Sequence, residues 1–145
     1  LVEFACNRPD RFDSADGMVK NYRDSRATAR WAPQAIEEMG RAVVRRDGAG
    51  WSLSCQRELA GSIYLAALTL DLWPKASDYG GPVKLIGADP DLKGNVPTGF
   101  ANQALARENG YVYEFIPQTG HLLQVERPEE CRNAMFSYLR ELGIA

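Results

Sequence analysis

The sequence predicts an α/β fold, in which a mostly helical segment (residues 1–76) precedes a parallel sheet with its helices (77–145). Two short apolar runs, at 82–87 and 111–116, read as strands. A helical pattern at 99–109 separates them. Because a strand–helix–strand order usually joins two parallel strands, we expect one right-handed crossover unit here.

The only histidine of the chain follows the second strand. Pro117 and Gly120 break that strand, His121 comes next, and Arg127 and Pro128 open a further helix. His121 is therefore expected on the loop that leaves the carboxyl end of a strand. Open α/β sheets bind their ligands at that edge, so a functional histidine is favoured over a loop histidine without a role.

Residues 117–130 read Pro-Gln-Thr-Gly-His-Leu-Leu-Gln-Val-Glu-Arg-Pro-Glu-Glu. This segment resembles the end of the last strand, the catalytic-histidine loop and the start of the last helix of α/β-hydrolase fold enzymes. The resemblance is carried by the glycine before the histidine, the apolar pair after it, the acidic residue and the Pro-Glu helix start. In that family the histidine is the general base of a nucleophile–histidine–acid triad, which implies this role for His121.

A histidine base needs a carboxylate that fixes its tautomer and stabilises the imidazolium. The run at 82–87 resembles the penultimate strand of the same family, and the family's acid commonly lies three residues after the glycine of that strand. Here Pro90 holds that position, between Asp89 and Asp91. We expect Asp89, the nearer to the strand, with Asp91 as the alternative. Both could instead cap the turn before Leu92, and in some family members the acid follows the sixth strand.

The nucleophile is missing from the sequence. The family's nucleophile elbow reads Gly-x-Ser-x-Gly, and Gly50-Trp-Ser-Leu-Ser, the nearest approach, lacks the second glycine. The resemblance thus implies a partner, an N-terminal half on a separate or cleaved chain, that carries the nucleophile and the oxyanion hole. Two parallel strands do not make a stable sheet. We therefore expect the chain on its own to be poorly soluble or molten.

Residues 1–76 resemble the cap that many α/β-hydrolases insert into the sheet. We expect a frayed strand end at 1–5, a short alternating strand or extended stretch at 51–55, and three helices, at 14–26, 33–45 and 57–73. A cap commonly lines an apolar substrate pocket, but core packing is the expected role of its large aromatic residues. These residues are Trp31, Trp51, Tyr64 and Trp73.

Composition excludes several classes of protein. The net charge is −2 with both signs interspersed, which leaves no basic face for nucleic acid. No apolar run approaches the ~20 residues of a membrane helix. Cys6, Cys55 and Cys131 have unrelated spacings and predict neither disulfides nor a metal site, so a reduced, cytoplasmic setting is expected. Cys131 falls on the apolar face of the last helix and is expected in the core.

The predicted function is hydrolysis of an ester, lactone or related bond in a small apolar substrate. His121 would be the base and Asp89 or Asp91 the acid, with serine, rather than aspartate, as the expected nucleophile on the N-terminal half. A serine mechanism needs no cofactor. Epoxide hydrolase and dehalogenase chemistry remain alternatives within the family. The alternative class is a non-catalytic, hydrolase-like module for binding or interaction.

Overall fold

The computed structural model describes residues 2–70, 78–93 and 98–144. The chain forms two compact units, each described by itself below. The first comprises Leu1–Ala29 and Pro33–Asp71, and the second comprises Arg30–Ala32 and Leu72–Ala145. Among the described residues, no helix is both long and apolar enough to span a bilayer.

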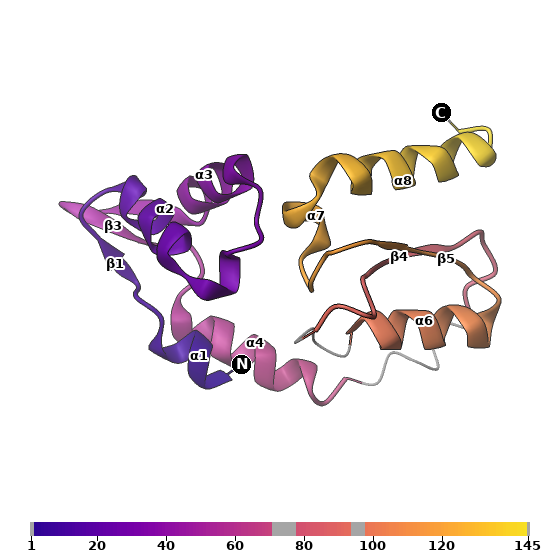
Figure 1. Cartoon of the computed structure of the whole chain (residues 1–145). Coiled ribbons are helices and arrows are strands. Elements are labelled where there is room, and N and C mark those ends of the chain that lie inside the picture. Colours follow the sequence, from indigo (N-terminus) through magenta and orange to yellow (C-terminus); the bar gives the residue numbers. More distant parts are fainter. Residues whose placement is uncertain (1, 71–77, 94–97, 145) are drawn as a thin grey trace. The chain divides into compact units, whose positions relative to one another are not determined.

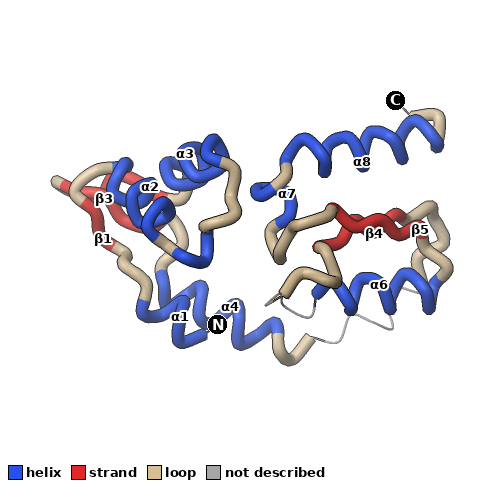
Figure 2. The backbone as a smooth tube through the Cα atoms, viewed as in Figure 1, coloured by secondary structure: helices blue, strands red, loops and turns tan. Residues whose placement is uncertain are grey.

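The first unit combines helices with a small antiparallel sheet (Figures 1 and 2). Helix α2 packs on α3, and α1 packs on α4. The sheet has the strand order β1-β3-β2. The elements in chain order are α1 (Val2–Asn7), β1 (Arg11–Phe12), α2 (Ala15–Asp24), the 3₁₀ turn η1 (Arg26–Thr28), α3 (Pro33–Ala42), β2 (Val44–Asp47), β3 (Gly50–Leu53) and α4 (Arg57–Ala67).

Two predictions for this unit are wrong. Residues 1–5 were expected to form a strand end, but helix α1 covers Val2–Asn7, and its Ala5 is buried. The helix expected at 33–45 ends at Ala42, because Val44 leaves it to pair with Leu53 in an antiparallel hairpin. Gly48 closes that hairpin with φ +61°, a left-handed conformation that glycine adopts without strain. The end expected for the third helix, at Trp73, lies outside the described residues.

The second unit contains the predicted strand–helix–strand–helix order. Strands β4 (Lys84–Ala88) and β5 (Val112–Ile116) pair in parallel, as predicted, with Lys84 opposite Val112 and Ala88 opposite Ile116. Helix α6 (Thr98–Asn109) lies on one face of this pair and α8 (Pro128–Glu141) on the other (Figures 1 and 2). Gly110 ends α6 with φ +68°. A short helix, α7 (Leu123–Glu126), precedes α8.

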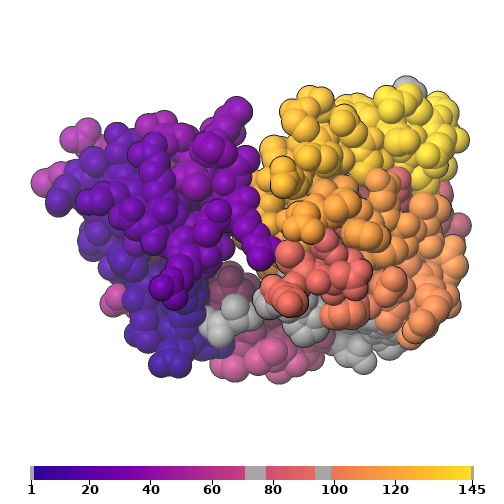
Figure 3. Space-filling view, in the orientation of Figure 1, coloured from indigo at the N-terminus to yellow at the C-terminus, as the bar shows by residue number. Residues whose placement is uncertain are grey.

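A buried lysine ties β5 and α8 to β4 at the amino end of the sheet. The Lys84 side chain is only 8% exposed, and its Nζ lies 2.6 Å from a carboxylate oxygen of Glu114. The same Nζ donates to the carbonyl of Ala134 at 3.3 Å and lies 5.7 Å from the centre of the Tyr138 ring. In the space-filling view the yellow atoms of α8 lie against the orange atoms of the same unit (Figure 3). The buried charge is thus paired, as burial of an ammonium group requires.

The crossing of α2 and α3 depends on a glycine. A Cβ at Gly40 would lie 2.7 Å from Val19 Cγ2 and 2.9 Å from Val19 Cα. Gly40→Ala should therefore force the two helices apart and destabilise the unit by about 1–3 kcal/mol, as overpacking does. Hydrogen–deuterium exchange should be faster in peptides from α2 and α3. Gly80→Ala is the control, because its Cβ would meet no described heavy atom within 4 Å. Equal exchange in the two variants would contradict the proposed close packing.

Candidate active site

The predicted histidine and its candidate acids lie beyond the carboxyl ends of β4 and β5. Because the two strands are parallel, both ends reach the same edge of the sheet. Asp89 directly follows β4, and the loop with His121 follows β5. The two segments are hydrogen-bonded to each other. The N–H of Asp89 donates to the carbonyl of Thr119 at 3.1 Å, and the N–H of Gln118 donates to Asp89 Oδ2 at 2.8 Å.

The two candidate acids have different environments. Asp89 is only 6% exposed, and its second carboxylate oxygen, Oδ1, accepts the N–H of Asp91 at 2.9 Å. One buried carboxylate therefore connects the turn after β4 to the histidine loop. Asp91 is exposed and contributes its backbone N–H to this arrangement. The carboxylate that is bonded to the histidine loop is thus that of Asp89.

The loop before the histidine has a constrained backbone. Gln118 has φ +61°, a left-handed conformation that is uncommon for a residue other than glycine. Such a conformation costs of order 1 kcal/mol and persists where the surroundings hold it. Here the bond to Asp89 holds Gln118, while the fully buried Thr119 donates its hydroxyl to the carbonyl of Ile116 at 2.6 Å. His121, which comes next but one, is exposed.

A second carboxylate reaches the loop from the other side. Glu126, at the end of α7, accepts the N–H of Gly120 on its Oε2 at 2.8 Å. Sequence analysis noted this acidic residue as part of the motif but gave it no role. A glutamate placed six residues after the glycine, beyond a short apolar stretch, is the signal that could have found it.

Burial also changes the ionisation of two nearby groups. The pKa of Tyr113 is raised by burial and by the negative charge of Asp89. Its ring lies over Gly87, where a Cβ would be 2.9 Å from Tyr113 Oη. The pKa of Cys131 is raised by burial and by the carboxylates of Glu130 and Glu126. The Cys131 thiol is therefore neutral at pH 7, which is unfavourable for a nucleophile.

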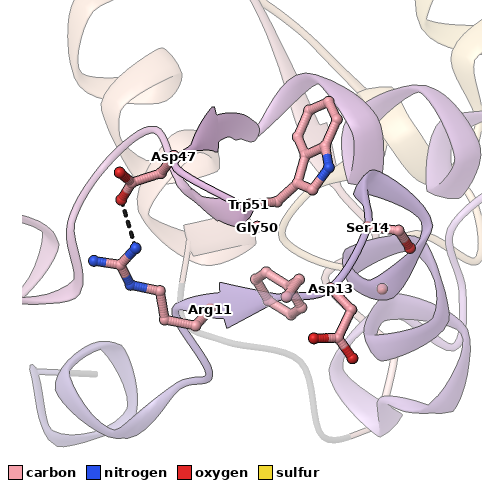
Figure 4. Close-up of a pocket in the computed structure, with 8 residues that line it drawn as sticks. Arg11, Asp13, Ser14, Asp47, Gly50 and Trp51 are labelled. Carbon is pink, nitrogen blue, oxygen red and sulfur yellow. Dashed lines mark hydrogen bonds and ion pairs between the residues drawn. The ribbon is translucent and has the colours of Figure 1, made fainter.

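The first unit has a surface hollow of its own, of about 510 Å³. In Figure 4, Arg11 and Asp47 face each other on one side of it, with an N–O distance of 2.5 Å, and Asp13 and Ser14 lie on the other. Trp51 lines the hollow and also packs against the core cluster of the unit. The residues that line the hollow include no histidine.

The other aromatic residues of the predicted cap are dispersed. Trp31 is half-buried in the second unit, Tyr64 is 44% exposed on α4, and Trp73 lies outside the described residues. Among the described residues, no group of three or more histidine, cysteine, aspartate or glutamate side chains is placed to hold a metal ion.

Comparison with solved structures gives one informative match, the crystal structure of E-2-(acetamidomethylene)succinate hydrolase. The TM-score is 0.75 and the sequence identity is 14%, over 96% of this chain and 52% of that chain. No protein-family model and no curated protein matches the sequence. At this identity the likeness shows the fold. It is a helical segment followed by the last two strand–helix units of an α/β-hydrolase sheet, and the chain spans about half the length of the matched structure.

The role of Asp89 in the loop can be tested by removing one acceptor. In Asp89→Asn one of the two oxygens becomes an NH₂ group, which cannot accept the N–H of Gln118 or that of Asp91. We expect the amide of Gln118 or Asp91 to exchange roughly tenfold faster than in the wild type. Without its acceptor, the free energy needed to expose that amide to solvent falls by on the order of 1–3 kcal/mol. Asp91→Asn, at an exposed position, is the matched control. Unchanged exchange in Asp89→Asn would show that the carboxylate does not hold the loop.

Proposed function

We propose that this α/β-hydrolase-fold chain is the cap and C-terminal half of a hydrolase. His121 is the general base, and Asp89, rather than Asp91, is the acid of the triad. One observation carries the proposal. The buried Asp89 carboxylate and the loop of the chain's only histidine are hydrogen-bonded at the carboxyl edge of a parallel sheet. This edge is where α/β sheets place their reactive groups.

In the proposed reaction His121 accepts the proton of the nucleophile and later donates it to the leaving group. Asp89 orients the imidazole and stabilises the imidazolium, and its backbone N–H partners keep the carboxylate in one place. The nucleophile, serine in preference to aspartate, lies on the N-terminal half and forms a covalent intermediate that water hydrolyses. Such a reaction uses no cofactor.

The proposed substrate is a small molecule with an ester, lactone or related bond. The matched structure is that of a hydrolase of E-2-(acetamidomethylene)succinate. We therefore include acetamido compounds among the proposed substrates. Of the substrate alternatives, cleavage of an acyl bond fits a serine nucleophile best, because the acyl group transfers to serine with release of the leaving group. Epoxide hydrolysis and dehalogenation would fit an aspartate nucleophile.

Exposed apolar surface supports a partner that carries the rest of the sheet. A groove of about 420 Å³ runs beside β4, lined by Ile86, Leu123, Pro128, Cys131 and Met135 among others. Met135 is 48% exposed. Among the described residues β4 pairs only with β5, so its other edge is unpaired, and such edges are normally paired or covered. The matched structure is also about twice as long as this chain. An N-terminal half that pairs with β4 would cover this groove.

One observation favours the second candidate, a non-catalytic binding module. Each oxygen of Asp89 already accepts a backbone N–H, so its carboxylate has a structural task that needs no reaction. The two candidates differ in one testable property. A hydrolase with a serine nucleophile reacts with a fluorophosphonate, whereas a binding module does not.

The chain assembled with its N-terminal half should become labelled by a fluorophosphonate at a serine of that half.

His121→Ala should lower ester hydrolysis by about 10³-fold or more, because the base is lost. Asp89→Asn should also lower turnover by orders of magnitude, while Asp91→Asn should not. Asn133→Ala, at an exposed position on α8 that does not line the groove beside β4, is the control for a surface substitution. Absence of labelling, together with no effect of His121→Ala, would favour the binding module.

The partner proposal predicts how the chain behaves alone. Residues 1–145 on their own should bind an apolar dye strongly, because the groove beside β4 and the exposed apolar side chains are open to solvent. Adding the N-terminal half should reduce dye fluorescence and produce a cooperative thermal transition together with activity. A monodisperse chain that binds little dye and melts cooperatively without a partner would contradict the proposal.

A further inference from the structure

The carboxylate of Glu126 has no role in the proposed triad, yet it is bonded to the peptide group that precedes the histidine. From this contact we infer that Glu126 is a positioning residue, which fixes the backbone of the catalytic loop and so sets the place of His121. The inference rests on the proposed function, because it assigns Glu126 an effect on the reaction through His121.

The contact between Glu126 and the loop is direct. Glu126 Oε2 accepts the N–H of Gly120 at 2.8 Å. The other oxygen, Oε1, would lie 2.9 Å from a Cβ at position 120, so the carboxylate sits against the glycine and would have to move to admit a side chain there. Gly120 is buried and Glu126 is half-buried. A hydrogen bond to a carboxylate in such a place is stronger than one between neutral groups.

The element that presents Glu126 is itself anchored. Within the turn of α7, the N–H of Val125 donates to the carbonyl of Leu122 at 3.0 Å, and that of Arg127 donates to Leu123 at 2.8 Å. The carbonyl of Val125 accepts the N–H of Ala32 at 2.8 Å, from the short segment that belongs to the same unit. Glu126 therefore acts from a fixed support and not from a mobile loop.

Two carboxylates hold the segment before the histidine at successive points. Asp89 binds the N–H of Gln118, and Glu126 binds the N–H of Gly120. Thr119, between them, is fully buried and donates its hydroxyl to Ile116. Every residue from 118 to 120 thus has a bond that restricts it, and the exposed His121 follows directly. Releasing Gly120 would free the last of these points, the one nearest the histidine.

A displaced base slows the chemical step more than it weakens substrate binding. A misplacement of about 1 Å can reduce a rate by about 10²-fold. Glu126→Ala removes the acceptor and should cause a loss of that size in kcat, with KM changed by less than about threefold. Glu126→Gln keeps an amide oxygen that can accept the same N–H. It should retain kcat within about fivefold of the wild type, because a neutral hydrogen bond is weaker but keeps the geometry.

The experiment uses the chain assembled with its N-terminal half and measures two properties of each variant. These are the exchange rate of the Gly120 amide, followed by hydrogen–deuterium exchange, and kcat and KM for ester hydrolysis. Glu130→Gln is the matched control. It removes another carboxylate that raises the Cys131 pKa, but Glu130 is exposed at the start of α8 and away from the Gly120 bond.

The inference is supported if Gly120 exchanges faster and kcat falls in Glu126→Ala, while Glu126→Gln and Glu130→Gln stay near the wild type in both. It is overturned if Glu126→Ala leaves Gly120 exchange and kcat unchanged, or if Glu126→Gln loses as much kcat as Glu126→Ala. A wild-type assembly with no hydrolytic activity would instead refute the proposed function. The exchange of Gly120 in Glu126→Ala would still report on the loop bond, so the two failures are distinguishable.

Discussion

The arrangement at the edge of the β4–β5 sheet depends on the burial of one carboxylate. A buried carboxylate is costly unless hydrogen-bond donors satisfy it. Asp89 meets this requirement with backbone N–H groups from both sides, Asp91 on its own turn and Gln118 on the histidine loop. The bond to Asp89 holds the left-handed Gln118, which lies three residues before the exposed His121.

The second unit therefore has a buried charge at each end of its sheet, with opposite signs. Lys84, at the start of β4, places a cation between the strands and α8, where Glu114 and the Ala134 carbonyl receive it. Asp89, just after β4, places an anion among backbone donors. The cation joins layers of the fold and lies far along the strand from the histidine loop. The anion joins the turn after β4 to the histidine loop at the carboxyl edge of the sheet.

Sequence reasoning located the strands of the second unit and their parallel pairing, because short apolar runs bounded by proline and glycine favour strands and the helix between them leaves few topologies. In the first unit it indicated β3 (Gly50–Leu53), where a strand or extended stretch is expected at 51–55, but it missed β1 and β2. Strands such as Arg11–Phe12 are too short for any periodicity, and Val44 continues a helical pattern until pairing with Leu53 overrides it. It could not choose between Asp89 and Asp91 with certainty, since Pro90 occupies the family position. The burial of Asp89 and its bond to Gln118 depend on the tertiary structure, which the spacing of residues in the sequence does not reveal.

The segment Arg30–Ala32 has a consequence for how the protein can be dissected. It interrupts the first unit in sequence but belongs to the second, where the N–H of Ala32 donates a hydrogen bond to the carbonyl of Val125. The boundary between the units is therefore crossed at several places along the chain, and no single cut separates them cleanly. A polypeptide that began after Asp71 would lack Ala32 and leave the Val125 carbonyl to water. Residues 30–32 thus supply a hydrogen bond to α7, the helix that carries Glu126. A truncation that removed these residues would remove this bond, even if every residue of the histidine loop were kept.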